Sequence, residues 1–151
     1  MRTFHVSRRL LLLLAILAVA SPVIYYLASP LVISRQVSET SPAAVSQTIA
    51  TGIFTDADSF HKTSGTAKVL QFADASRVLR LEGFRTTNGP DLFVYLSADK
   101  QAREFVNLGG LKGNIGDQNY DIPASADLAR YKFVLIYCRA FSTLFGSAEL
   151  F

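Results

Sequence analysis

Cys138 is the residue of this sequence with the clearest potential for chemistry. It is the single cysteine among 151 residues, which excludes an internal disulfide framework, a Cys-x-x-Cys redox motif and a multi-cysteine zinc or iron–sulfur site. A lone thiol can still serve as a redox-active thiolate, as one ligand to a prosthetic group, or as a small hydrophobic side chain in a core. All three roles remain open at this point.

His61 is the second candidate, in a polar segment at residues 56–65 ahead of an expected strand. One histidine cannot supply both the base of a catalytic triad and a set of metal ligands, and no Gly-x-Ser-x-Gly motif of a serine hydrolase occurs. We therefore expect no metal site, and the residues alone indicate a histidine in a surface loop.

A strand expected at residues 133–139 would position Cys138. Side chains alternate along a strand, so the thiol should share a face with Val134 and Ile136, opposite Tyr137 and Arg139. A thiol in an oxidising compartment is exposed to oxidation unless it is buried, ligated or used. The pattern therefore predicts a thiol that faces the core or a bound group.

The chain from residue 48 onward is expected to be all-β. All nine glycines follow this point and separate short apolar runs, as turns do between short strands. The continuous apolar runs at residues 92–96 and 133–138 indicate strands covered on both faces, so we expect two packed sheets. The predicted fold is a β-sandwich of about seven to eight short strands.

The individual elements are expected as follows. Strands are predicted at residues 50–55, 66–72, 77–85, 92–97, 105–108, 113–121, 133–139 and 144–151. Short helical connectors are predicted at residues 98–104 and 125–129, and a turn at Asn88-Gly89-Pro90-Asp91, where Gly89 is free to take a positive φ. Only Phe4 of the 11 phenylalanines lies outside the domain, so phenylalanine is expected to fill most of the core.

An apolar segment without charge, residues 10–33, precedes the domain. As a helix it would be about 36 Å long, enough to span a bilayer. Arg2, Arg8 and Arg9 precede it and only Arg35 closely follows it, so the positive-inside rule places the N-terminus in the cytoplasm. The sequence predicts a single-pass protein of the cell membrane whose C-terminal domain is extracytoplasmic.

The domain organisation follows from this topology. We expect a basic cytoplasmic N-terminus at residues 1–9, a transmembrane signal anchor at 10–33, a flexible linker at 34–47 and the β-domain at 48–151. The competing interpretation is a signal peptide that is cleaved after Ala20, in the small-x-small sequence Ala18-Val19-Ala20. Export by the twin-arginine pathway, indicated by Arg8-Arg9, is a further interpretation.

The charge balance argues against a nucleic-acid partner. The 15 Lys and Arg exceed the 12 Asp and Glu by three, and three arginines precede the apolar segment. The remainder is neutral and has no basic stripe, so no nucleic-acid partner is expected.

Several blocks of sequence then point to a family. These blocks are Ser59-Phe60-His61-Lys62-Thr63-Ser64-Gly65, Asn88-Gly89-Pro90-Asp91-Leu92-Phe93, Leu108-Gly109-Gly110-Leu111-Lys112-Gly113 and Val134-Leu135-Ile136-Tyr137-Cys138. Together they resemble the DM-thirteen domain, an electron-transfer domain often found beside DOMON domains, over residues 50–151.

The resemblance implies a small β-rich extracytoplasmic domain whose characteristic cysteine lies in the last strands. Cys138 matches that cysteine, which in the family is taken to act as a bare thiol or to bind a prosthetic group such as haem. His61 matches a histidine of the family and is a second candidate for contact with such a cofactor. The domain stands here behind a membrane segment without a DOMON domain, so its electron donor or acceptor should be a separate protein.

Two functions are compatible with these observations. The first is a membrane-anchored extracytoplasmic electron-transfer module in which Cys138 is the redox-active thiol or the ligand of a prosthetic group. The second is a non-enzymatic β-sandwich that binds a cell-envelope or cell-surface partner, with Cys138 only a packed core residue. The sequence leaves open whether the chain is an enzyme.

Overall fold

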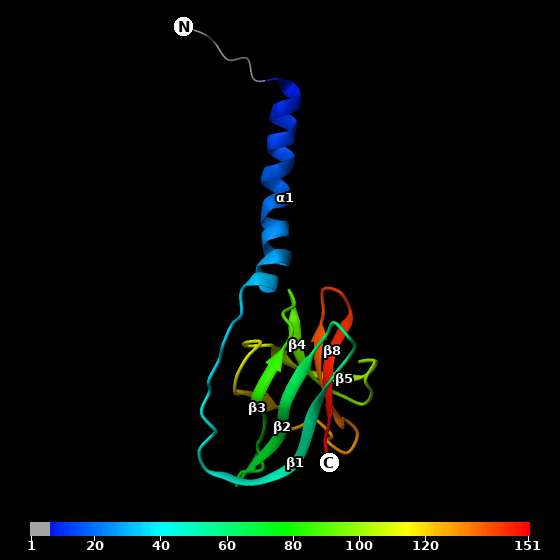
Figure 1. Ribbon diagram of the computed structural model, residues 1–151. Coiled ribbons are helices and arrows are strands. Elements are labelled where there is room, and N and C mark those ends of the chain that lie inside the picture. Colours follow the sequence, from blue (N-terminus) through cyan, green and yellow to red (C-terminus); the bar gives the residue numbers. More distant parts are fainter. Residues whose placement is uncertain (1–6) are drawn as a thin grey trace.

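The computed structural model describes residues 7–151 and consists of one long helix followed by a β-domain (Figure 1). Most of the N-terminal segment predicted at residues 1–9 lies outside the described residues. The elements are α1 (Arg8–Val32), β1 (Val45–Asp56), β2 (Thr63–Phe72), β3 (Arg77–Thr86), β4 (Leu92–Ser97), β5 (Phe105–Gly110), β6 (Gln118–Ile122), β7 (Phe133–Cys138) and β8 (Thr143–Glu149). The expected apolar helix and all-β domain of about eight strands are confirmed.

The strands form one antiparallel sheet in the order β5-β4-β7-β8-β1-β2-β3-β6, curved into a nearly closed barrel. The prediction of two separate sheets is therefore wrong. β1 is the reason, because it pairs with β2 over residues 45–53 and with β8 over residues 54–56. Two register shifts in β1, at Val45/Gln47 and Thr48/Ala50, are of the kind that bends a strand. One strand thus continues from one half of the barrel into the other.

The outer face of β4 explains why its apolar run needs no second sheet. Tyr95 is buried there, with its ring stacked on Phe105 at a centroid distance of 4.1 Å and on Tyr137 at 5.6 Å. Aromatic neighbours on adjacent strands therefore cover this face.

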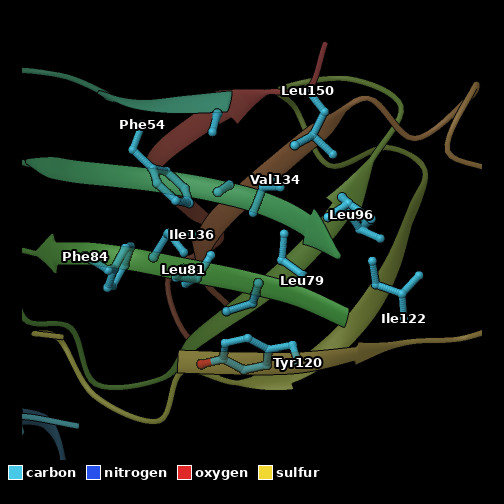
Figure 2. Packing of buried hydrophobic residues seen from close by; sticks show 14 of the residues in the cluster. Phe54, Leu79, Leu81, Phe84, Leu96, Tyr120, Ile122, Val134, Ile136 and Leu150 are labelled. Atoms are coloured by element: carbon cyan, nitrogen blue, oxygen red, sulfur yellow. The ribbon is translucent and has the colours of Figure 1, made fainter. Parts of the chain in front are cut away.

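The core is built mainly from leucine, valine and isoleucine, which line the inside of the barrel (Figure 2). Of the phenylalanines, Phe54, Phe84 and Phe145 are buried, whereas four others are exposed. The expectation that phenylalanine fills most of the core is therefore wrong. The exposed ones are Phe60, Phe105, Phe141 and Phe151.

Two smaller expectations also need correction. Residues 98–104 and 125–129 form turns and bends instead of helices. In the first of them, the Asp99 carboxylate accepts hydrogen bonds from the backbone of Gln101 and Arg103, an arrangement that competes with helix formation. β6 begins only at Gln118, because the residues before it form a loop.

The segment after α1 lies along the barrel. The prediction of a flexible linker at residues 34–47 did not include such contacts with the barrel. We call residues 35–40 the docked segment. Its backbone donates three hydrogen bonds, from Arg35 N to Asn114 Oδ1 at 2.7 Å, from Val37 N to the Ile115 carbonyl at 2.9 Å, and from Glu39 N to the Asp117 carbonyl at 3.0 Å. The remaining residues of the predicted linker include the start of β1 at Val45.

Two glycines in the β5–β6 loop make room for the docked segment. A Cβ at Gly113 would lie 2.5 Å from the Arg35 carbonyl oxygen, and a Cβ at Gly116 would lie 1.9 Å from that of Val37. Gly116 also has a φ of +101°, which favours glycine. The loop sequence is therefore adapted to close contact with the backbone of the docked segment.

Candidate functional site

Cys138 is the last residue of β7 and is fully buried, with 0% exposure. Its cross-strand neighbours are Leu92 on β4 and Thr143 on β8. Val134 and Ile136 on the same strand are buried with it in the core cluster. The face predicted for the thiol by strand alternation is confirmed.

The surroundings of Cys138 do not fit a haem. An axial ligand must present its sulfur to an open space that holds the macrocycle. The Cys138 side chain is instead enclosed by the core, and the pockets described within residues 7–151 are lined by other residues. The packing around Cys138 in this conformation therefore offers no space beside the thiol for a haem.

His61 is held in the β1–β2 loop (residues 57–62) by Asp58. His61 Nδ1 lies 2.7 Å from Asp58 Oδ2, while Asp58 Oδ1 accepts hydrogen bonds from the backbone N–H groups of Phe60 and His61. These interactions, with the His61 side chain first, lower the pKa of Asp58 to about 2. The His61 ring packs against Phe145 at a centroid distance of 4.3 Å.

Cys138 and His61 lie toward the same end of the barrel, but the structure records no contact between them. Phe145, which packs against His61, belongs to the core cluster that contains Cys138. His61 therefore packs on Phe145 at the edge of the core, whereas Cys138 lies inside it, and their joint contact with a cofactor stays a prediction.

A pocket of about 310 Å³ lies at this end, next to the C-terminus of α1. We call it the helix-facing pocket. It is lined by Ile33, Arg35, residues 88–93 and residues 110–114. Leu92 therefore belongs both to the pocket lining and to the core cluster around Cys138. Cys138 is thus the cross-strand neighbour of a residue that lines the pocket.

Gly89 allows the β3–β4 loop (residues 87–91) to lie directly over the core at this pocket. A Cβ at Gly89 would lie 2.9 Å from Leu92 Cδ2 and 2.9 Å from Phe145 Cζ. The glycine is therefore needed for space, and the expectation that Gly89 takes a positive φ is wrong.

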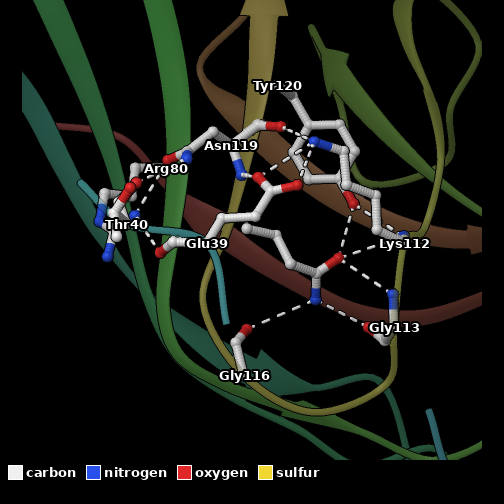
Figure 3. Close-up of polar contacts among 9 residues, drawn as sticks. Glu39, Thr40, Arg80, Lys112, Gly113, Gly116, Asn119 and Tyr120 are labelled. Carbon is white, nitrogen blue, oxygen red and sulfur yellow. Dashed lines mark hydrogen bonds and ion pairs between the residues drawn. The ribbon is translucent and has the colours of Figure 1, made fainter. Parts of the chain in front are cut away.

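Two polar pairs border the helix-facing pocket, and the sequence patterns indicated neither. Arg139 Nε lies 2.9 Å from Asp91 Oδ2, and its guanidinium lies 4.3 Å from the centre of the Phe93 ring. Lys112 Nζ donates to both carboxylate oxygens of Glu39 (Figure 3). Asp91 lies in the Asn-Gly-Pro-Asp block, which predicts a turn but no ion pair. Glu39 lies in a Ser-rich segment, where no pattern marks it as a binding residue.

The electrostatics of the second pair favour ionised Glu39. The hydrogen bond from Lys112 is the largest cause that lowers the pKa of Glu39, and the backbone N–H of Asn119 adds to it at 2.7 Å. Arg80 Nη1 also donates to the Glu39 carbonyl oxygen at 3.2 Å. The wall of the pocket is thus tied to the docked segment by charge.

The part of the chain that the structure describes contains no cluster of three His, Cys, Asp or Glu side chains that could hold a metal ion. The Cys138 thiol is separated from the helix-facing pocket by its cross-strand neighbour Leu92, which lines that pocket. The arrangement can support thiol chemistry only if this cover moves.

Comparison with known proteins identifies one family. The sequence model described as "Electron transfer DM13" matches residues 54–150, which include His61, both blocks of the helix-facing pocket and Cys138. No curated protein matches the chain, and no solved structure matches it.

Proposed function

We propose, from the premise that this chain belongs to the DM13 electron-transfer family, that it is an electron-transfer domain fixed to the outer face of a membrane, with the bare thiol of Cys138 as its redox centre. The observation that carries this proposal is the position of Cys138 beneath the helix-facing pocket. Blocks 88–93 and 110–114 are separate in sequence but line one pocket, and Leu92 of that pocket is the cross-strand neighbour of Cys138.

The anchor is the part of the proposal that concerns location. α1 has 25 residues and would be about 37 Å long, and its apolar side chains are exposed along much of its length. Helices of this composition serve as anchors or as signal sequences. We favour a retained anchor because the apolar sequence continues beyond Ala20 to Ile33. Full-length protein that resists carbonate extraction would support it, and a chain shortened at Ala20 would contradict it.

The chemistry proposed is thiol–disulfide exchange with dithiol proteins. The Cys138 thiolate attacks a disulfide of an acceptor, one sulfur–sulfur bond forms as the acceptor's bond breaks, and the released acceptor sulfur takes the proton that Cys138 gave up. A donor dithiol then attacks Cys138 Sγ and frees the acceptor as a dithiol. The donor's second thiol closes its own disulfide and restores the Cys138 thiol. Two electrons pass from donor to acceptor.

Burial of Cys138 sets a condition on this chemistry. Exchange requires an opening of the barrel end in which Leu92 and Phe145 move away from the thiol. Such local openings can need much less free energy than global unfolding. The alternative function, a binding module with a packed cysteine, is favoured by the complete burial of the thiol. The two functions differ in whether this opening occurs.

The test uses glutathione disulfide as the probe on the full chain in detergent micelles. Formation of one glutathione adduct is followed by mass spectrometry, in the native sequence and in a Cys138→Ala/Val134→Cys variant. Val134 is the matched control because it is equally buried on the same face of β7. We expect the native chain to react at least about tenfold faster than the control.

Equal rates in the two chains would contradict the proposal. The rate of global unfolding of the native chain, measured by circular dichroism, gives a second reference that does not depend on the control variant. Adduct formation no faster than global unfolding would show that Cys138 is a packed residue and would favour the binding module.

A further inference from the structure

We infer that the end of the barrel next to α1 rests on the surface of the lipid bilayer, and that Phe60 and Phe141 insert there among the lipids. The inference rests on the membrane anchor of the proposed function. It identifies an interaction surface and its partner, a bilayer of phospholipids, independently of any redox role of Cys138.

The two phenylalanines occupy exposed positions at loop tips. Phe60 is 81% exposed in the β1–β2 loop, and Phe141 is 61% exposed in the β7–β8 turn (residues 139–142). Large apolar side chains at the tips of polar loops are typical of segments that enter a membrane interface. Phe151 is also 85% exposed, but it lies at the C-terminus, at the opposite end of the barrel (Figure 1).

Hydrogen bonds connect these loops to each other and to the end of α1. Thr87 in the β3–β4 loop accepts a hydrogen bond from Lys62 N at 2.9 Å and donates one to the Phe60 carbonyl at 3.3 Å. In the same loop, Asn88 Nδ2 donates to the Ile33 carbonyl at 3.5 Å.

The β7–β8 turn joins this group through Asp91. The Asp91 carbonyl accepts a hydrogen bond from Arg139 N at 2.9 Å, and the side chains of the two residues form an ion pair. The three loops and the exit of α1 therefore form one end of the molecule, which Figure 1 shows directly below the helix.

The short connection keeps this end close to the membrane. Only Ile33 and Ser34 separate α1 from the docked segment, and extended residues span roughly 3.4 Å each, so the barrel end stays within about 10 Å of the helix. A hydrocarbon core of about 30 Å takes up about 20 helical residues. Counted from Leu10, these end near Ser29, and the rest of α1 lies among the headgroups. The loops must therefore meet the headgroup layer.

The charges at this end favour apolar insertion over attraction to anionic lipids. Lys62 pairs with Asp56 and Arg139 pairs with Asp91, while the Asp58 carboxylate lies within hydrogen-bond distance of the His61 ring. Arg35 and Arg85 are exposed, and neither forms an ion pair within residues 7–151. Two free guanidinium groups suit contact with lipid phosphates, while the balanced pairs give little net charge. A zwitterionic bilayer is therefore sufficient as the partner.

The helix-facing pocket would then open toward the bilayer. Ile33 and Arg35, which continue from α1, form part of its lining.

Tryptophan fluorescence tests the inference cleanly, because the sequence contains no tryptophan. Phe60→Trp, Phe141→Trp and Phe151→Trp each introduce one reporter at an exposed position, so each variant should fold. The full-length variants are reconstituted in phosphatidylcholine nanodiscs with or without brominated acyl chains. We expect bromine to quench the first two by about twofold and to leave Phe151→Trp unquenched.

Quenching of Phe60→Trp and Phe141→Trp no stronger than that of Phe151→Trp would overturn the inference. Because α1 is present in the reconstituted chain, this result does not depend on whether the helix is cleaved in cells. Failure of the anchor would instead appear as a shortened chain that carbonate extracts, so the two failures are distinguishable.

Discussion

Glu39 and Lys112, which are 73 residues apart in the sequence, form an ion pair at 2.8 Å that fastens the docked segment to the wall of the helix-facing pocket. The Lys112 ammonium also donates to the Asn119 carbonyl at 2.7 Å, which holds it against β6. One cluster of polar contacts therefore couples the exit of α1 to the barrel.

The first prediction is that Glu39→Gln loosens the docked segment. The neutral amide loses the charged hydrogen bonds to Lys112, and we expect the free energy of unfolding to fall by about 1 kcal/mol because the pair is partly exposed. Trypsin should cleave after Arg35 faster in this variant. Glu104→Gln is the control, since its ion pair with Arg130 lies outside the docked segment. Equal cleavage in both variants would contradict the role of Glu39.

The second prediction concerns the pH dependence of the same contact. The pKa of Glu39 is lowered from its ordinary value of 4.5, so the unfolded chain binds more protons than the native chain in acid. The contribution of Glu39 is therefore complete above about pH 4.5 and is lost as the pH falls through the lowered pKa. Thermal melts from pH 7 to pH 3 should show the native chain and Glu39→Gln converging in acid. A constant difference in melting temperature would contradict this.

The third prediction tests the space that glycine provides for the docked segment. A Cβ at Gly113 would lie 2.5 Å from the Arg35 carbonyl oxygen and 2.7 Å from Val37 Cγ2. Gly113→Ala should therefore displace the segment, lower the stability by about 1–3 kcal/mol and speed cleavage after Arg35. Gly110→Ala is the matched control, because its Cβ would meet no atom within 4 Å. Similar proteolysis of the two variants would show that the segment does not need this contact.

Local sequence patterns predicted most of the strands. The continuous apolar run gave β4 its exact bounds, Leu92–Ser97, and alternation placed Cys138 inward, because each depends only on neighbouring residues. The single sheet could not be predicted in the same way. It follows from β1, whose register shifts near Val45 arise from pairing with β2, and such pairing leaves no mark on the sequence of one strand.

The docked segment and the cover over Cys138 could not be predicted from the sequence either, but for a different reason than the single sheet. Apart from the Glu39 carboxylate, the docked segment binds through the backbone N–H groups of Arg35, Val37 and Glu39. Every residue type except proline has such a group, so the Ser-rich composition resembled a free linker. The cover over Cys138 comes from Leu92 and from the core around Phe145. A family resemblance identified the cysteine, whereas its burial depends on the three-dimensional packing.

The fourth prediction concerns the pair of Asp58 and His61. The Asp58 carboxyl should titrate near pH 2, because the His61 side chain and two backbone N–H groups stabilise its ionised form. A lowered pKa stabilises the fold above the ordinary value of 3.8, and this contribution is lost as the pH falls to about 2. Carbon NMR of the carboxyl group measures the midpoint. It should rise toward 3.8 in His61→Phe, and an unchanged midpoint would show that the backbone donors alone are responsible.

The last prediction compares Cys138→Ala with Cys138→Ser. Alanine leaves a small cavity in a fully buried site, which should cost about 1–3 kcal/mol of unfolding free energy. Serine should cost about 1 kcal/mol more, because its hydroxyl is buried in an apolar cluster without an assigned partner. Denaturant unfolding of the full chain in micelles measures both. A Cys138→Ser variant as stable as Cys138→Ala would indicate that polar groups or water reach this site.

The same two variants bear on the haem alternative. The native chain should show no visible absorption, since the site has no room for a haem. A colour that disappears in Cys138→Ala would contradict the bare thiol.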